Sequence, residues 1–509
     1  MLDTGCWMLD AGYIIRLLTY VFRLPSYSYL CTKPQTLMNH FRFLPSVLCL
    51  LFFPFAGLHS QSLPRPKNII IMIGDGMGYN AIQAADYFYG RKQVYEDFPV
   101  KLAMAHYPAK AGEYEANNPA SNYWAHGYST LPAWKDTAWL KSDFTESAAA
   151  ATALATGFKT YNNSIGFSLS YDTLVNLTQW AKGIGKSTGV VTSVEFSHAT
   201  PAGFVAHNKV RTNYARIAYE MLLDSRCDVI MGCGNPMYND NGNKLTGKWK
   251  NACYVGDSAF WVQLHAGSGK TTRFLAGGQQ RVVSDIDGDG IPDPWTVIQD
   301  TSEFRTLMSG ACPKRVLGCP KIYSTLQQSR TMLNGETKST PPFTTPFNAG
   351  VPRLSVMVKG ALNVLDNNPK GFLVMIEGGA IDWAEHGNQK GRLLEEMKDF
   401  DDAVAAVVNW VNANSSWDET MVIVTADHET GLVWGDKPFE PLKDEGAGKL
   451  PGFTFYSSNH SNSLVGFFAK GIGSDYYRQY ADETDSVRGP YIQNSEVAQL
   501  IHFLWPKQK

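Results

Sequence analysis

Residues 68–76 read NIIIMIGDG, an isoleucine-rich run that ends in a Gly-Asp-Gly turn. A continuous apolar run, without alternation of apolar and polar residues, is typical of a strand whose sheet is covered on both faces. Polar residues at the ends of such strands are where an α/β sheet places its functional site. The stretch therefore predicts a central buried strand that delivers Asp75 to one edge of the sheet.

Further apolar runs also end in turn or polar residues, and helical patterns lie between them. The clearest helical pattern is 391–414, in which apolar residues recur at three- and four-residue steps against a charged face. Strands alternating with helices predict an α/β fold with a doubly wound, mostly parallel central sheet and helices on both faces. The further runs are 188–192, 228–231, 372–376, 421–425 and 464–468.

Two loop-rich segments interrupt this alternation. Residues 112–143 are rich in Trp, Tyr, Asn and Pro, and residues 234–350 are rich in Gly, Asn, Thr and Pro. Because strand patterns resume after each segment, we interpret both as insertions into a single catalytic domain over residues 61–509.

The composition excludes two broad classes of protein. Aromatic residues make up 12% of the 509 residues, which supplies ample apolar surface and argues against intrinsic disorder. The 45 Lys and Arg residues face 47 Asp and Glu residues, for a formal net charge of −2. A strongly basic nucleic-acid binder is therefore not expected, and nucleic acid is not a predicted partner.

Residues 38–60 have the pattern of a secretory signal peptide. Met38 precedes a short basic region, residues 43–55 are apolar and uncharged, and small residues follow at 56, 57 and 60. The apolar run is too short to cross a bilayer. We expect an exported protein, periplasmic or secreted, whose mature chain lacks a transmembrane segment. Residues 1–37 are interpreted as a mis-called start or a leader, and a buried element at 43–55 is the alternative.

Export would leave five cysteines in an oxidising compartment, an odd number. Cys312 and Cys319 are close enough in sequence to pair, and two of the other three could also pair. The connectivity stays open at this point. The other three are Cys227, Cys233 and Cys253.

Carboxylate and imidazole residues gather after three of the predicted strands. Hard oxygen and imidazole groups suit zinc and magnesium. Each residue alone has an ordinary interpretation, such as a turn or a surface pair, and it is their joint occurrence that indicates a metal site. They are Asp75, Glu377, Asp382, His386, Asp427 and His428.

Ser147 begins an alanine-rich, strongly helical stretch that Gly157 can end. The structural interpretation of such a serine is a helix N-cap. The functional interpretation uses the same position, because a helix amino terminus offers free N–H donors and a positive dipole end that bind phosphate. A serine held there by a metal can attack phosphorus.

Taken together and in this order, these blocks resemble the alkaline phosphatases. The resemblance extends from residue 68 to about residue 470 and so covers nearly all of the predicted mature chain. The matching blocks are residues 74–78, 145–157, 198–201 with Arg211, 377–386, 425–428 and His460.

The resemblance implies a role for each matching position. Asp382, His386 and His460 would bind one zinc ion. Asp75, Asp427 and His428, with the Ser147 oxygen, would bind a second zinc ion. Asp75, Thr200 and Glu377 would bind a third ion, usually magnesium. Ser147 would be the nucleophile, and Arg211 would hold two phosphate oxygens.

Three positions depart from the enterobacterial pattern in the family. His198 replaces an Asp and Trp383 replaces a Lys, a pair that is similar to some other bacterial members. We interpret these two as neighbours of the third metal or direct ligands to it, with neutral drift as the alternative. Glu146 replaces the more common Asp before the nucleophile, which puts the orientation of Arg211 in question.

The long insertion contains an acidic motif with the spacing of a calcium loop. Acidic residues fall at positions 1, 3, 5 and 9, with Gly at position 6, but position 12 is Thr296 and not the usual bidentate Glu. A calcium site and a solvated acidic turn are both compatible with this partial match. The acidic residues are Asp285, Asp287, Asp289 and Asp293.

The sequence as a whole predicts hydrolysis of phosphate monoesters to an alcohol and inorganic phosphate through a phosphoserine intermediate, with two zinc ions and one magnesium ion. A homodimer is expected from the resemblance. The alternatives are a phosphodiesterase or another hydrolase with a similar metal core, and, from a different class, a non-catalytic calcium-binding surface protein.

Overall fold

The stretch at 68–76 forms strand β1 (Asn68–Gly74), and all of its residues are buried. The computed structural model describes residues 65–109 and 127–506, which belong to one compact unit. In it, β1 pairs in parallel with β9 (Phe372–Gly378) on one side and with β10 (Thr420–Thr425) on the other. The prediction of a central buried strand is confirmed.

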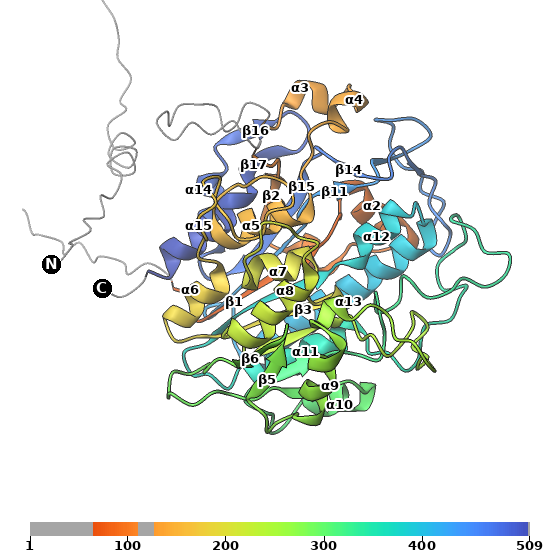
Figure 1. Cartoon of the computed structure of the whole chain (residues 1–509). Coiled ribbons are helices and arrows are strands. Elements are labelled where there is room, and N and C mark those ends of the chain that lie inside the picture. The colour runs from red at the N-terminus through yellow and green to blue at the C-terminus, as the bar shows by residue number, and fades with distance from the viewer. Residues whose placement is uncertain (1–64, 110–126, 507–509) are drawn as a thin grey trace, which may run out of the picture. The chain divides into compact units, whose positions relative to one another are not determined.

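Around β1, the described residues build one eleven-stranded mixed sheet (Figure 1). The seven neighbouring strands from β10 to the far edge beyond β9 are all parallel. Antiparallel pairs occur only toward the other edge of this sheet. The predicted mostly parallel sheet is confirmed. The order is β16 (Glu483–Asp485), β17 (Gly489–Gln493), β2 (Val100–Ala105), β15 (Val465–Gly471), β10, β1, β9, β3 (Ser187–Glu195), β4 (Val229–Cys233), β8 (Val316–Gly318) and β7 (Thr296–Ile298).

Two groups of helices pack on this sheet, and members of both groups contact β9. One group is α2 (Tyr79–Tyr89), α11 (Leu354–Leu365), α12 (Ala380–His386) and α13 (Lys390–Asn414). The other is α5 (Ser147–Thr156), α6 (Leu177–Gly183), α7 (Ala199–Val205) and α15 (Asn494–Leu504). Helices on both faces are therefore confirmed, and α13 is the helix predicted at 391–414.

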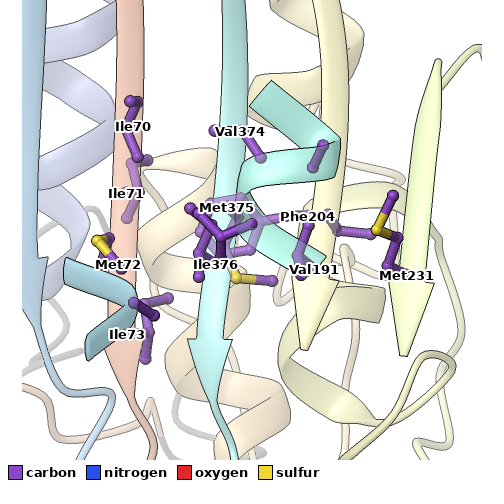
Figure 2. Packing of buried hydrophobic residues seen from close by; sticks show 14 of the residues in the cluster. Ile70, Ile71, Met72, Ile73, Val191, Phe204, Met231, Val374, Met375 and Ile376 are labelled. Carbon is purple, nitrogen blue, oxygen red and sulfur yellow. The ribbon is translucent and has the colours of Figure 1, made fainter. Parts of the chain in front are cut away.

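The core lies between the strands and these helices. Figure 2 shows isoleucine and methionine side chains of β1 and β9 beside Val191 of β3 and Met231 of β4, with Phe204 of α7 among them. These side chains are fully or almost fully buried. The continuous apolar composition of the strands thus has its cause in burial on both faces.

The segment 234–350 differs from a simple insertion, because it supplies the edge strand β7 and its neighbour β8 to the sheet. Each spans only three residues, which is too short for a recognisable apolar run. The described part of 112–143 carries α3 (Thr130–Ala133) and α4 (Thr137–Leu140). The predicted leader 1–37 and signal peptide 38–60 lie outside the described residues.

The remaining elements are short. They are the helices α8 (Tyr214–Tyr219), α9 (Ser258–Ala266), α10 (Thr301–Leu307) and α14 (Tyr477–Tyr480), the 3-10 turns η1 (Val94–Asp97), η3 (Ala252–Val255) and η4 (Ser474–Tyr476), the π-turn η2 (Glu220–Asp224), and the strands β5 (Arg273–Ala276), β6 (Gln279–Val282), β11 (Glu429–Thr430), β12 (Val433–Trp434), β13 (Thr454–Phe455) and β14 (His460–Ser461).

Two further findings concern the cysteines and the helices. All five cysteines of the described part are unpaired, so the pairing suggested for Cys312 and Cys319 does not occur in this structure.

Within residues 65–109 and 127–506, no helix combines the length and the apolar character that a membrane crossing requires.

Candidate active site

Three neighbouring parallel strands bring the predicted polar residues to one edge of the sheet. Asp75 directly follows β1, Glu377 lies near the end of β9, and Asp427 and His428 follow β10. The register aligns Ile73 of β1 with Glu377 on one side and with Thr425 on the other. All four polar side chains are almost completely buried.

A second set of residues completes the cluster from two other elements. Asp382 and His386 lie one turn apart on α12, with 3.3 Å between Asp382 Oδ2 and His386 Nε2. His460 lies on β14, and its Nε2 is 3.5 Å from Asp382 Oδ1. His386 is the most open of these groups, with 36% of its side chain exposed, so it marks the side from which solvent reaches the cluster.

The hydrogen bonds of His386 and His460 fix which ring nitrogen carries the proton. His386 Nδ1 lies 2.7 Å from the Ser458 carbonyl oxygen, and His460 Nδ1 lies 2.8 Å from the Thr145 carbonyl oxygen. Because a carbonyl oxygen only accepts, each Nδ1 is the donor, and Nε2 is the nitrogen of each ring that faces the cluster. Burial opposes the charge of His386, but its hydrogen bond and ion pair with Asp382 outweigh burial and raise the pKa of His386 to about 9. The two Nε2 atoms face each other at 3.1 Å, which requires a proton or a cation between them.

The third imidazole has the same orientation. Thr430 donates its hydroxyl proton to Asp382 Oδ1 at 2.6 Å, and the Thr430 oxygen lies 3.3 Å from His428 Nδ1 and can accept from it. Burial, and then the neighbouring His460, hold the pKa of His428 well below its usual value, so the ring is neutral. Its Nε2 lone pair faces Asp427 Oδ2 at 3.2 Å and Asp75 Oδ1 at 3.5 Å.

These contacts bring acceptor atoms together without donors. Asp75 Oδ1, Asp427 Oδ2 and Glu377 Oε1 are buried and have no hydrogen-bond partner among the described residues. Burying unpaired carboxylates is costly unless a cation compensates them. The donor set therefore fits metal ions, and two groups of ligand atoms within 4.8 Å of one another are present: Asp382, His428 and His460, and Asp75, Asp427 and His428.

The pKa shifts have the same origin. Burial, followed by repulsion from Asp427 and Asp382, raises the pKa of Asp75 well above its usual value. Burial also raises the pKa of Asp427 to about 6 and that of Glu377 to about 7. A bound cation would reverse this effect, since a nearby positive charge favours the carboxylate.

Thr200 and Glu377 form an all-oxygen side of the cluster around Asp75. Thr200 Oγ1 lies 3.5 Å from Asp75 Oδ2 in the first turn of α7. Thr192 of β3 donates to Glu377 Oε2, which leaves Oε1 directed to the cluster without a partner in the described chain. Oxygen-only groups of this kind suit magnesium.

Ser147 is the first residue of α5 and is buried, with its Oγ 3.3 Å from His428 Nε2. The interpretation of Ser147 as the N-cap is wrong, because Glu146 occupies that position. The Glu146 carboxylate accepts from the backbone N–H groups of Ala148 and Ala149 at 3.0 and 2.9 Å. These two donors are therefore not free for phosphate, which corrects part of the sequence-based argument.

Glu146 also orients Arg211, because Arg211 Nη1 donates to Glu146 Oε2. Burial opposes ionisation of Glu146, but Arg211 and the backbone donors outweigh it and hold the pKa below its usual value. Glu146 in place of Asp therefore does not leave Arg211 without an orienting partner. An ion pair with Glu146 fixes the guanidinium at the amino end of α5.

His198 and Trp383 lie beside the cluster and outside its two ligand groups. The ring of His198 stacks on Tyr214, with centroids 5.8 Å apart, and is 5.7 Å from the ring of Trp383. His198 Nδ1 is buried and has no hydrogen-bond partner in the described ranges. Burial, and then Arg211, lower the pKa of His198 to about 3, which keeps the ring neutral.

The acidic loop of the long insertion is only partly assembled. Carboxylate oxygens of Asp285, Asp287 and Asp289 come within 4.8 Å of one another. Asp293 does not join them, because one of its oxygens accepts from Ile286 N at 2.9 Å and the other pairs with Lys314 at 2.6 Å. Lys314 also pairs with Asp287, so a side chain already balances part of the charge of the loop.

Two contributors escaped the sequence argument. Thr192 is opposite Glu377 in the β3–β9 register, and Thr430 links Asp382 to His428. Threonines are common in strands, so the residue type alone does not indicate that Thr192 or Thr430 lies at a functional site. Only the strand pairing, which the sequence does not contain, places them at the site.

Comparisons with known proteins show the family of the chain. The family model described as alkaline phosphatase matches residues 66–256 and 322–484, which is more than half of the chain. The chain therefore belongs to the alkaline phosphatase family, and family and fold together support phosphatase activity.

Several relatives carry the same family name. Alkaline phosphatase H of Pseudomonas aeruginosa is 30% identical over 383 residues, which cover 72% of this chain and 70% of that protein. Alkaline phosphatase 4 of Bacillus subtilis is 30% identical over 381 residues, covering 74% of this chain but only 64% of its own length. The solved alkaline phosphatase of the Antarctic bacterium TAB5 has a TM-score of 0.57 at 23% identity, with 88% of this chain and 100% of that chain covered, and supports the fold.

Proposed function

We propose that the protein hydrolyses phosphate monoesters to an alcohol and inorganic phosphate through a phosphoserine on Ser147. One observation carries the proposal: the Ser147 hydroxyl lies 3.3 Å from an inward-facing imidazole lone pair, in a cluster of unpaired carboxylates. Arg211 is held at the same helix end by the residue before Ser147. Ser147 as the nucleophile and the Arg211 guanidinium as the group that binds phosphate would therefore act beside a cluster of side chains that can hold metal ions.

The residues divide into three metal positions by their chemistry. Asp382, His386 and His460 would hold one zinc ion, and Asp75, Asp427 and His428 a second, because imidazole with carboxylate suits zinc. Asp75, Thr200 and Glu377 would hold magnesium. When bound, the ions supply Lewis acidity that stabilises the charge of the transferring phosphoryl group and of the serine oxygen.

The side chains perform the remaining steps. Ser147 Oγ forms a bond to phosphorus, the phosphorus–ester oxygen bond breaks, and the alcohol leaves with the proton that the serine gives up. Water then attacks phosphorus, the bond to Ser147 Oγ breaks, and the serine regains a proton as phosphate leaves. Arg211 donates to phosphate oxygens with its planar fork, and Glu146 keeps that fork in position.

One assay separates this function from its alternatives. Hydrolysis of a chromogenic phosphate monoester is measured beside a phosphodiester and a sulfate ester, with and without a chelator. We expect the monoester to be preferred and the activity to depend on metal. A preference for the diester would support the phosphodiesterase alternative. No hydrolysis of any ester by metal-loaded protein would favour the non-catalytic calcium-binding alternative.

Arg211→Lys is expected to raise both KM and the inhibition constant of inorganic phosphate about tenfold, because a point charge replaces a bidentate donor. Steady-state kinetics with phosphate as a competitive inhibitor measure both constants. Arg216→Lys, on the exposed side of α8, is the matched control. An unchanged phosphate inhibition constant in Arg211→Lys would show that Arg211 does not bind the phosphate group.

His198→Asp is expected to lower, several-fold, the magnesium concentration that gives half-maximal activity, because a carboxylate adds a hard oxygen ligand near the all-oxygen group. A histidine-to-aspartate mutant of the TAB5 enzyme was solved with magnesium in a site named M3, which supports the test here. Magnesium and cobalt titrations of wild type and variant provide the measurement. Identical titration curves would count against a role for His198 at this ion.

Export, assembly as a homodimer and calcium binding by residues 285–293 stay predictions. Sequencing the amino terminus of the secreted protein tests the first. Light scattering of the purified chain tests the second. Calcium titration followed by a thermal melt tests the third, and a melt unaffected by calcium would leave the loop as a solvated acidic turn.

A further inference from the structure

A row of aromatic rings leads away from the candidate active site. Trp383 and Tyr214 both contact the ring of His198, at 5.7 and 5.8 Å between centroids. Tyr214 continues to Tyr254 at 4.7 Å, and Tyr254 continues to Tyr323 at 5.7 Å. We call these five residues the aromatic row.

The row begins where the phosphate group would bind. Trp383 directly follows Asp382 on α12, and Tyr214 opens α8 three residues after Arg211. After burial, the charge of Arg211 is the next contribution to the pKa shifts of both Tyr214 and His198. The inner end of the row therefore adjoins both the metal-ligand helix and the arginine that would bind phosphate.

The rings are held in place but are not enclosed. Every member of the row is half-buried. Ser197 donates to the carbonyl oxygen of Tyr254 at 3.0 Å, which ties η3 to the loop before α7. Tyr323 donates its hydroxyl to the Asn251 carbonyl oxygen at 3.0 Å. Because Tyr214 and Tyr254 are half-buried, part of each side chain stays exposed.

We propose that the aromatic row is a leaving-group subsite for phosphate monoesters whose alcohol carries a planar aromatic group beyond a short spacer, as in nucleoside 5′-monophosphates. The inference rests on the proposed function, because the phosphate group must occupy the site beside Arg211 and Ser147. It adds a substrate class to that function.

Two physical arguments support this class of substrate. Half-exposed rings that are fixed in position favour a planar partner, since aromatic groups stack with little loss of side-chain entropy. His198 and Trp383 occupy the inner end, so the surface of Tyr214 and Tyr254 lies one to two ring spacings farther out. In a nucleotide the sugar separates the base from the phosphate group, so the base would lie against Tyr214 and Tyr254. A sugar phosphate has no base that could stack on these rings.

The test compares two substrates that share one leaving group. Adenosine 5′-monophosphate and ribose 5-phosphate both release a primary 5′-alcohol, and only the first carries a base. In metal-loaded enzyme, we expect Tyr254→Leu to lower the ratio of kcat/KM for the nucleotide over that for the sugar phosphate about tenfold, the scale of one lost base–aromatic stack. Tyr254→Phe, which keeps the ring, should retain the wild-type ratio.

Tyr87→Leu serves as the matched control, because it removes a half-buried tyrosine ring from α2, outside the row. A thermal melt shows that each variant is folded, and Tyr214→Leu repeats the test if Tyr254→Leu does not fold. The inference is overturned if the ratio stays at its wild-type value in the leucine variant, or if both substrates lose activity equally. Failure of the wild type to hydrolyse either substrate would instead overturn the proposed function.

Discussion

Ser147→Ala is expected to lower kcat for a phosphate monoester on the order of 10³-fold or more, as the loss of a nucleophile does in other covalent mechanisms. Ser147 is the hydroxyl that faces His428 Nε2 at 3.3 Å. Alanine fits the amino-terminal turn of α5, where the next residues are alanines and Glu146 supplies the cap. The variant should therefore fold and bind metal, and the melting temperature and metal content check both points.

Ser170→Ala is the matched control, because Ser170 is exposed, lies in a turn and is not one of the residues of the cluster. Its kcat should equal that of the wild type. Monoester hydrolysis that survives Ser147→Ala undiminished would refute the phosphoserine mechanism and leave direct attack by water as the explanation.

Removal of metal is expected to lower kcat/KM on the order of 10³-fold or more, since Lewis-acid stabilisation of transferred phosphoryl groups contributes several kcal/mol. The melting temperature should fall as well, because the buried carboxylates lose their compensating charge and ligands that bind only the native state stabilise it. Elemental analysis, a thermal melt and activity are measured before and after chelation. Zinc with magnesium should restore all three.

A variant tests the same point without a chelator. Asp427→Asn removes a charge from the group of Asp75, Asp427 and His428 and should lower both zinc content and activity. Asp418→Asn, on an exposed loop, is the control. Full activity and an unchanged melt in metal-free protein, confirmed by elemental analysis, would contradict the account of the cluster.

Strand patterns and strand-end residues carry most of the information that the sequence holds about this fold. The run at 68–73 identifies β1 because burial on both faces demands apolar residues at every position. The same reasoning finds β9 and β10, and thereby Glu377, Asp427 and His428, which follow directly from where those strands end. His460 came from the family resemblance, because β14 is only two residues long.

Other features depend on contacts between distant residues. The strands β7 and β8 are too short to show a pattern. They join the sheet only because β8 pairs with β4 and β7 pairs with β8. Glu146 takes the cap of α5 because its longer arm reaches two backbone donors and Arg211 at once, which residue type alone does not reveal. The aromatic row joins residues as far apart as 198 and 383, so no local pattern could predict it.

The most direct test of the central claim is the location of trapped phosphate. Metal-loaded enzyme is mixed with a radiolabelled phosphate monoester, quenched in acid, digested and mapped by mass spectrometry. We predict label on the peptide that contains Ser147, at up to one phosphate per chain, and none in Ser147→Ala. Label on a different residue, or wild-type turnover with no trapped label under conditions that favour the intermediate, would contradict the account.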